Sequence, residues 1–290
     1  MTCEEMIYSN DYSDYGINFL KGFEGAEEAY RMGCVNVIDP KIAILHMPRP
    51  SDYLTLLERT PYSYVPKLFG LMDSSNVEAV GVTSVQNPNY FDLDGKNVIV
   101  GVVDTGIDYQ NSLFLDAQGR SRIGVIWDQT LTGFEKSDEI PVPYYGTAFS
   151  GRQIQEAIGS EKPFEIVPSK DTNGHGTYIT GVAAGGENRQ KDFTGIAGGA
   201  EIAVVKLKTA KPYLKEFYGV AENVEAYSET DLIYAVEYLY RYALSRNCPV
   251  SIVIGLGSSN GGHLGYTFLE QYLSILLENV WIMVSAPAGN

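Results

Sequence analysis

Apolar runs of strand length alternate with helix-like segments from about residue 96 onward. Strands are expected at 97–103, 201–207, 250–256 and 280–285, and helices are expected at 175–184, 229–246 and 266–278. Nearly continuous apolar strands that alternate with helices are typical of a parallel sheet covered on both faces. The pattern therefore predicts an α/β fold for residues 87–290.

Residues 1–86 show a different pattern. Short strands are expected at 35–38 and 42–45, on either side of the turn pair Asp39-Pro40, and a short helix is expected at 51–59. We interpret residues 1–86 as a small α+β domain that ends at the turn-forming residues Asn87-Pro88-Asn89.

A long insertion at 116–170 is rich in glycine, proline, tyrosine and charged residues. A strand is expected within it at 122–127, which includes Trp127. The pattern of the insertion indicates no function.

Composition limits the classes of partner. The 290-residue chain has 36 acidic and 21 basic residues, which gives a net charge of −15. An acidic surface repels phosphate backbones and anionic lipids, so neither a nucleic-acid partner nor a membrane is expected. No apolar run reaches transmembrane length, and the first residues lack the basic and apolar regions of a signal peptide. These features predict a soluble protein made in the cytoplasm.

The cysteine pattern predicts neither a disulfide framework nor a metal centre. Cys3, Cys34 and Cys248 are widely separated and form no C-x-x-C motif, so neither a disulfide framework nor a zinc site is predicted. No cofactor is predicted, and a structural calcium ion has no support in the sequence.

The residues that could carry chemistry follow the predicted strands. Asp104, the segment Gly255–Ser258 and Asn290 lie at or just beyond carboxyl ends, where parallel α/β sheets bind ligands. A carboxylate at such an end can accept a hydrogen bond from an imidazole and fix its tautomer. The alternative for Asp104 is an aspartate that begins a turn.

His175 is one of three histidines, and it lies between Gly174 and Gly176 at the start of a predicted helix rich in small residues. Flanking glycines leave an imidazole base accessible to a nucleophile, and its ordinary pKa suits proton transfer. The alternative is a helix start with an incidental histidine. His46 and His263 have no comparable setting, and we interpret them as structural or surface residues.

Two further segments each have two interpretations. The Asn290 side chain could donate a hydrogen bond to an oxyanion, or Asn290 could be a turn residue after Gly289. The segment Gly255-Leu256-Gly257-Ser258 could bind an extended peptide by strand addition, or it could be a loop between a strand and a helix.

Two other motif matches are rejected because the chain lacks the partner residues that their chemistry requires. Asp104-Thr105-Gly106 matches the aspartic-protease tripeptide, but the chain has no second such tripeptide to supply the paired carboxylate. The segment Gly257–Gly261 matches a G-x-S-x-G nucleophile elbow, yet no aspartate follows Ser259, and the histidine after it is only four residues away.

In the order Asp104, His175, Asn290, the chain resembles the subtilisin-like serine proteases. The resemblance is carried by Val102–Ile107, Asn173–Thr177 and Ala288–Asn290. It implies a subtilisin-like fold in which Asp104 orients His175, His175 acts as the general base and Asn290 donates to the oxyanion. It also implies that Gly255, Leu256, Gly257 and Ser258 bind substrate, with Gly255 at a position where the family usually has serine.

The segments Pro66–Met72, Gly81–Asn87 and Ile126–Thr130 resemble the clostridial Csp-type subtilases more closely. That group includes spore-germination proteases and inactive relatives that act as germinant sensors. The resemblance implies that residues 1–86 are a prodomain, which the protease cuts between Gln86 and Asn87 and which then stays bound. It also implies a spore or cytoplasmic location.

The chain departs from the family in one respect. The Gly-Thr-Ser segment that carries the family's nucleophile is absent from residues 1–290. We therefore expect a serine endopeptidase whose C-terminal segment lies elsewhere, and we expect this chain to be inactive by itself. Its expected partners are a protein or peptide substrate, its own prodomain and the missing segment. The alternative is an inactive pseudoprotease that senses a ligand or binds a partner protein.

Overall fold

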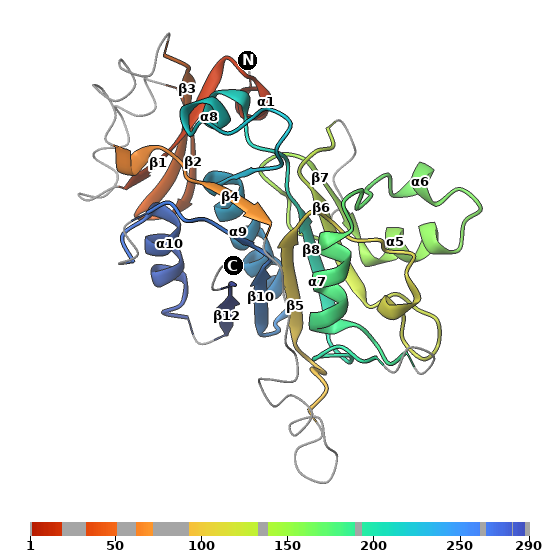
Figure 1. The fold of residues 1–290 in the computed structure, drawn as a ribbon. Coiled ribbons are helices and arrows are strands. Elements are labelled where there is room, and N and C mark those ends of the chain that lie inside the picture. Colours follow the sequence, from red (N-terminus) through yellow and green to blue (C-terminus); the bar gives the residue numbers. More distant parts are fainter. Residues whose placement is uncertain are drawn as a thin grey trace. The chain divides into compact units, whose positions relative to one another are not determined.

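A computed structural model describes eight ranges of the chain (Figure 1), namely 2–18, 33–50, 62–71, 93–132, 139–188, 193–261, 265–279 and 281–287. The helix expected at 51–59 and the boundary at 87–89 lie outside these ranges. The chain divides into two compact units. The first contains 1–70, 208–237 and 258–278, and the second contains 71–207, 238–257 and 279–290. The predicted division into residues 1–86 and 87–290 stays a prediction.

The second unit contains a six-stranded sheet. Its strands, in spatial order, are β12 (Ile282–Ser285), β10 (Val250–Ile254), β5 (Ile99–Asp104), β8 (Glu201–Lys206), β6 (Ile123–Asp128) and β7 (Thr147–Ser150). Neighbouring strands from β12 to β6 are parallel, and β7 is antiparallel to β6. The carboxyl ends of the parallel strands therefore meet at one edge of the sheet.

Both faces of β5 are covered, and all six of its residues are buried. Val100 and Val102 belong to the same core cluster as Ile179 of α7 (His175–Ala184). On the other face, a Cβ at Gly101 would lie 3.0 Å from Leu239 of α9 (Glu229–Arg246), so the glycine lets this helix pack closely. The predicted α/β fold with helices on both faces of a mostly parallel sheet is confirmed.

The insertion at 116–170 is largely structured. It contains β6, β7, α5 (Gly151–Ile158) and α6 (Pro163–Ile166), and the short helix η4 (Ser112–Phe114) precedes it. Trp127 is fully buried, its indole N–H donates to the Tyr145 carbonyl at 2.7 Å, and its ring packs on Tyr145 and Tyr238. The insertion thus extends the sheet and its core.

The first unit contains an antiparallel sheet with the strand order β1-β3-β2. The strands are β1 (Tyr12–Asn18), β2 (Cys34–Asp39) and β3 (Ile42–Pro48). The other elements of this unit, with the N-terminal half of α9, are α1 (Cys3–Tyr8), η2 (Tyr62–Tyr64), β4 (Leu68–Leu71), α8 (Pro212–Phe217), β9 (Tyr227–Ser228) and α10 (Phe268–Leu276). A Cβ at Gly16 would collide with the Phe268 ring, so β1 packs closely on α10.

The prediction about cysteine pairing is wrong for Cys3 and Cys34. These residues form a disulfide with a Cα–Cα distance of 5.5 Å, whereas Cys248 is free. The pair joins the first residue of α1 to the first residue of β2. A sequence separation of 31 residues gives no signal of this proximity, because only the packing of α1 on the sheet creates it.

Among the described residues, no helix combines the length and the apolar character needed to cross a membrane.

Candidate functional site

Asp104 is the last residue of β5, and its side chain is fully buried. One oxygen of the carboxylate, Oδ1, accepts a hydrogen bond from the Thr105 amide at 2.7 Å. The position follows from the fold: a buried strand ends where the chain turns, so a polar side chain can stand at the edge of the sheet without entering its core.

His175 begins α7, and its imidazole lies against Asp104. The Nδ1 atom is 2.8 Å from Asp104 Oδ1 and 3.0 Å from Oδ2. Because a carboxylate only accepts hydrogen bonds, Nδ1 carries the proton and Nε2 is the basic nitrogen. The His175 side chain is 16% exposed while that of Asp104 is 0% exposed. The pair therefore combines a buried acid with a base that solvent can reach.

Two glycines allow the histidine to take this position. Gly174 has a φ of +88°, a left-handed conformation that glycine adopts without steric cost. A Cβ at Gly176 would collide with the Gly106 carbonyl oxygen, so the start of α7 can approach the segment after Asp104 only with glycine there.

The structure brings one of the other predicted segments to this pair. The Gly255 amide donates to the Val103 carbonyl at 3.3 Å, directly before Asp104. A Cβ at Gly255 would collide with Asp104 Oδ2 and would lie 3.4 Å from His175 Cε1. The Asp104 carboxylate therefore occupies the space that a side chain at position 255 would need in this structure.

The other predicted site residues lie in the segment after Gly255 or outside the described ranges. Leu256 is buried in β11 (Leu256–Gly257), and Ser258 accepts a hydrogen bond from the Asn260 amide at 3.1 Å. Asn290 lies outside the described residues, so its predicted role as the oxyanion donor stays a prediction. Gln86 and Asn87, the predicted cleavage site, also lie outside them.

Sequence reasoning missed Asp171, and it gave no role to Thr105 and Thr177, which lie within the selected motifs. The Asp171 carboxylate accepts hydrogen bonds from Thr105 Oγ1 at 2.9 Å and from Thr177 Oγ1 at 2.6 Å. Burial alone would raise the pKa of the Asp171 carboxyl, but hydrogen bonds from Thr177, Gly174 and Thr105 outweigh burial and hold the pKa below its usual range. The sequence did contain a signal that could have identified Asp171: it lies four residues before His175, close to the predicted helix start, where side chains often accept hydrogen bonds from the first helix amides.

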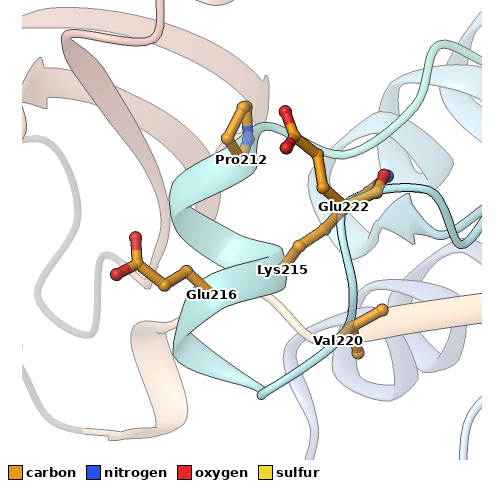
Figure 2. Close-up of a pocket in the computed structure, with 5 residues that line it drawn as sticks. All are labelled: Pro212, Lys215, Glu216, Val220 and Glu222. Atoms are coloured by element: carbon orange, nitrogen blue, oxygen red, sulfur yellow. The ribbon is translucent and has the colours of Figure 1, made fainter.

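Neither the acidic and metal-binding residue types nor the hollow at α8 forms a further ligand site among the described residues. No group of three or more His, Cys, Asp or Glu residues in the described ranges could hold a metal ion. In the first unit, a hollow of about 310 Å³ at α8 is lined by Pro212, Lys215, Glu216, Val220 and Glu222. Figure 2 shows the two carboxylates on different sides of the helix, so they do not converge on one ligand. The Lys215 ammonium group donates to the carbonyls of Glu222 and Val224.

Comparison with known proteins finds similarity to one family over the segment that carries this pair. Residues 95–227 match the subtilase family, Peptidase_S8. The solved structure of the CspB protease of Clostridium perfringens is 32% identical, with a TM-score of 0.59, and the match covers 72% of this chain and 39% of that chain.

Two curated relatives are plant proteins. The subtilisin-like protease SBT3.8 of Arabidopsis thaliana is 24% identical over 186 residues, and the match covers 59% of this chain and 23% of that protein. SBT3.6 from the same plant is 27% identical over 112 residues, which are 36% of this chain and 14% of the relative. The chain thus spans less than a quarter of the plant relatives it matches. Residues 95–227, which carry both Asp104 and His175, are thus similar to the subtilase family of subtilisin-like serine proteases.

Proposed function

We propose that the complete protein is a serine endopeptidase that hydrolyses peptide bonds with an Asp–His–Ser triad. The observation that carries the proposal is the hydrogen bond of 2.8 Å between His175 Nδ1 and the fully buried Asp104 carboxylate. By its resemblance to the Csp-type subtilases, the protein would activate another protein by limited proteolysis.

The proposed reaction assigns one role to each residue. Asp104 holds the imidazole in the tautomer with Nε2 unprotonated. Nε2 takes the proton of the serine hydroxyl while the serine oxygen attacks the peptide carbonyl carbon, and His175 then gives that proton to the leaving amine. The Asn290 amide donates to the oxygen that becomes negative, and the substrate lies extended along Gly255–Ser258. The serine belongs to the complete protein and is not assigned within residues 1–290.

The experiment compares peptide hydrolysis by the complete protein and by two variants. His175→Ala should abolish hydrolysis, whereas His263→Ala, the same substitution at a histidine without an assigned role, should leave it unchanged. Equal hydrolysis by the complete protein and His175→Ala would overturn the proposal. If the complete protein has a residue other than serine at the nucleophile position and hydrolyses no peptide, the pseudoprotease alternative replaces it.

We propose in addition that residues 1–86 act as a prodomain that stays bound after cleavage at Gln86-Asn87. Contacts within the first unit support this. The Lys211 ammonium group donates to the Met6 and Tyr12 carbonyls, each at 3.1 Å, and the Asn36 amide donates to the Tyr234 hydroxyl at 2.7 Å.

A strand contact supports the same proposal. β4 pairs antiparallel with β9, and the Lys67 main chain forms hydrogen bonds at both of its polar groups with Glu229. An extended segment bound in this way has the main-chain pattern of a peptide held by strand addition. Because Lys67 and β4 precede the predicted cut, both would remain with the released fragment.

N-terminal sequencing of the purified protein tests the cut. The active protein should begin at Asn87 and copurify with the fragment 1–86, while His175→Ala should begin at Met1. Fully active protein that begins at Met1 would contradict the proposed processing.

A further inference from the structure

The first turn of α7, which begins at His175, is capped by side chains from outside the helix. The first amides of any helix have no partner within it. Here the His175 amide donates to Asn173 Oδ1 at 3.2 Å, the Gly176 amide to Thr105 Oγ1 at 2.9 Å, and the Thr177 amide to Asp171 Oδ2 at 2.8 Å. The position of His175 therefore depends on side chains to which the sequence analysis gave no role, and Asp171 lies outside the motifs it selected.

Asp171 is the centre of this arrangement. Its Oδ1 accepts from Thr105 Oγ1 at 2.9 Å and from the Gly174 amide at 2.8 Å, and its Oδ2 accepts from both the amide and the hydroxyl of Thr177. Thr105 directly follows Asp104, and Gly174 directly precedes His175. One carboxylate thus connects the chain on either side of the Asp104–His175 hydrogen bond.

The segment that leads to Asp171 is itself held at three points. The Val167 carbonyl accepts from Tyr109 Oη at 3.0 Å, and the Lys170 carbonyl accepts from Lys206 Nζ at 2.6 Å. The Ser169 hydroxyl donates to Asp128 Oδ2 at 2.7 Å. Because these partners follow or end β5, β6 and β8, the C-terminal end of the 116–170 insertion is fixed to the sheet that carries Asp104.

Asp171 also places a charge at the helix start. The N-terminus of a helix carries a partial positive charge, which disfavours an imidazolium there. Two carboxylates oppose it: Asp104 from β5 and Asp171 from the loop before α7. Other charged groups near the site include the exposed Asp108, whose amide donates to Thr177 Oγ1. They also include Lys206 of β8, whose ammonium group donates to the Lys170 carbonyl and lies 3.7 Å from the buried Asp128 carboxylate.

We propose that Asp171 is a positioning residue of the proposed hydrolytic site, which holds His175 against Asp104 and favours the protonated imidazole. The inference rests on the proposed function, in which His175 is the general base that this geometry and this proton affinity serve. On this proposal, the C-terminal part of the 116–170 insertion holds Asp171, and through it His175, in place.

The test is an NMR titration of the histidine rings in the ring-labelled protein, with the His175 signal assigned from its loss in His175→Ala. Asp171→Asn removes the charge but keeps one acceptor oxygen, and it should lower the pKa of His175 by about 0.5 pH unit. The matched control is Asp108→Asn, which removes an exposed charge nearby and should shift the pKa much less because water screens it. Equal shifts in the two variants would overturn the charge role.

A second variant tests the geometry without a change of charge. Thr105→Val removes the hydroxyl that joins Asp171 to the Gly176 amide, and it should weaken the His175–Asp104 hydrogen bond, which is seen as an upfield shift or loss of the Nδ1 proton signal. An unchanged Nδ1 signal would overturn the positioning role. Neither measurement needs turnover, so a protein that hydrolyses no peptide but shows both effects would refute the proposed function and leave this inference standing.

Discussion

Within the described ranges, two Asp–His pairs share the same contact but have different surroundings. In the second unit, Asp104 and His175 meet at 2.8 Å between the end of a strand and the start of a helix. In the first unit, Asp14 and His46 meet at 2.6 Å on directly opposed positions of β1 and β3. The His175 side chain is 16% exposed, whereas that of His46 is 1% exposed.

The pair in the first unit is enclosed in a network. Asp14 Oδ1 also binds the Lys211 ammonium group at 2.8 Å, and the His46 Nε2 atom faces the Tyr234 hydroxyl at 3.0 Å. Burial would raise the pKa of Asp14, but the charge of Lys211 and the contact with His46 outweigh it and lower the pKa to about 2. Of the two predicted roles for His46, structural or surface, the structure confirms the structural one, because His46 is buried.

The comparison teaches that an Asp–His contact does not by itself make a general base. A base needs a basic nitrogen within reach of a substrate, and the surrounding elements decide this. Around His46 the partners fill both ring nitrogens. Around His175 the acid is buried and the ring is accessible.

The largest expected effect separates the two histidines. His175→Ala in the complete protein should abolish hydrolysis, and the loss of about 10⁶-fold in turnover measured for subtilisin itself is the expected scale. His46→Gln should instead lower the free energy of unfolding and leave the pH–rate profile of the folded protein unchanged. A similar loss of turnover in folded His46→Gln would break the comparison.

Lys211→Met should destabilise the first unit most strongly. The substitution leaves the buried Asp14 carboxylate without its cation, and breaking such a pair costs about 3–5 kcal/mol. Urea unfolding measures the loss. Lys162→Met, which removes a largely exposed ion pair with Glu165, is the matched control and should cost less than about 1 kcal/mol. Equal costs for the two variants would contradict the buried network.

Gly255→Ser tests how closely the Asp104–His175 pair is packed. The new side chain would collide with Asp104 Oδ2, so it should displace the acid and cost about 1–3 kcal/mol of stability. A small displacement of a catalytic group lowers turnover by about 10²-fold. Gly159→Ser controls for a serine at a glycine position, because Gly159 has a φ of −80° and a Cβ there would make only ordinary van der Waals contacts. If Gly255→Ser has wild-type turnover, the prediction is wrong, because the residues around position 255 then accommodate the serine without displacing Asp104.

The smallest expected effect is the acid titration of Asp14. Its pKa of about 2 in the folded protein lies below the ordinary value of 3.8. The unfolded state therefore binds the proton more tightly, so the stabilisation is present above about pH 4 and is lost as the pH falls through 2. Asp14→Asn, compared with the wild type at pH 5 and pH 2, should show a difference of about 2 kcal/mol in this contribution. A difference that does not change with pH would contradict the assigned charge state.

Much of the fold of the second unit could be predicted because its elements are marked locally. The helices at His175–Ala184 and Glu229–Arg246 have the predicted bounds, and the predicted strands lie within two residues of the observed ones. Apolar runs mark buried parallel strands whatever their partners are. In contrast, β1 was not predicted, because Tyr12–Asn18 mixes polar and apolar residues, and its buried Ser13 and Asp14 are stabilised by partners far along the chain.

The sequence by itself determined the elements, the order of the candidate residues and the residue types at the strand ends. These properties depend on neighbours along the chain. Only the tertiary structure decided that Asp104 meets His175, that Asp171 caps the histidine's helix, that Gly255 has no space for a side chain, and that Cys3 meets Cys34. The reason is physical: hydrogen bonds and close contacts between distant segments form where the packing of strands and helices brings their atoms within about 3 Å, and no local pattern encodes that distance.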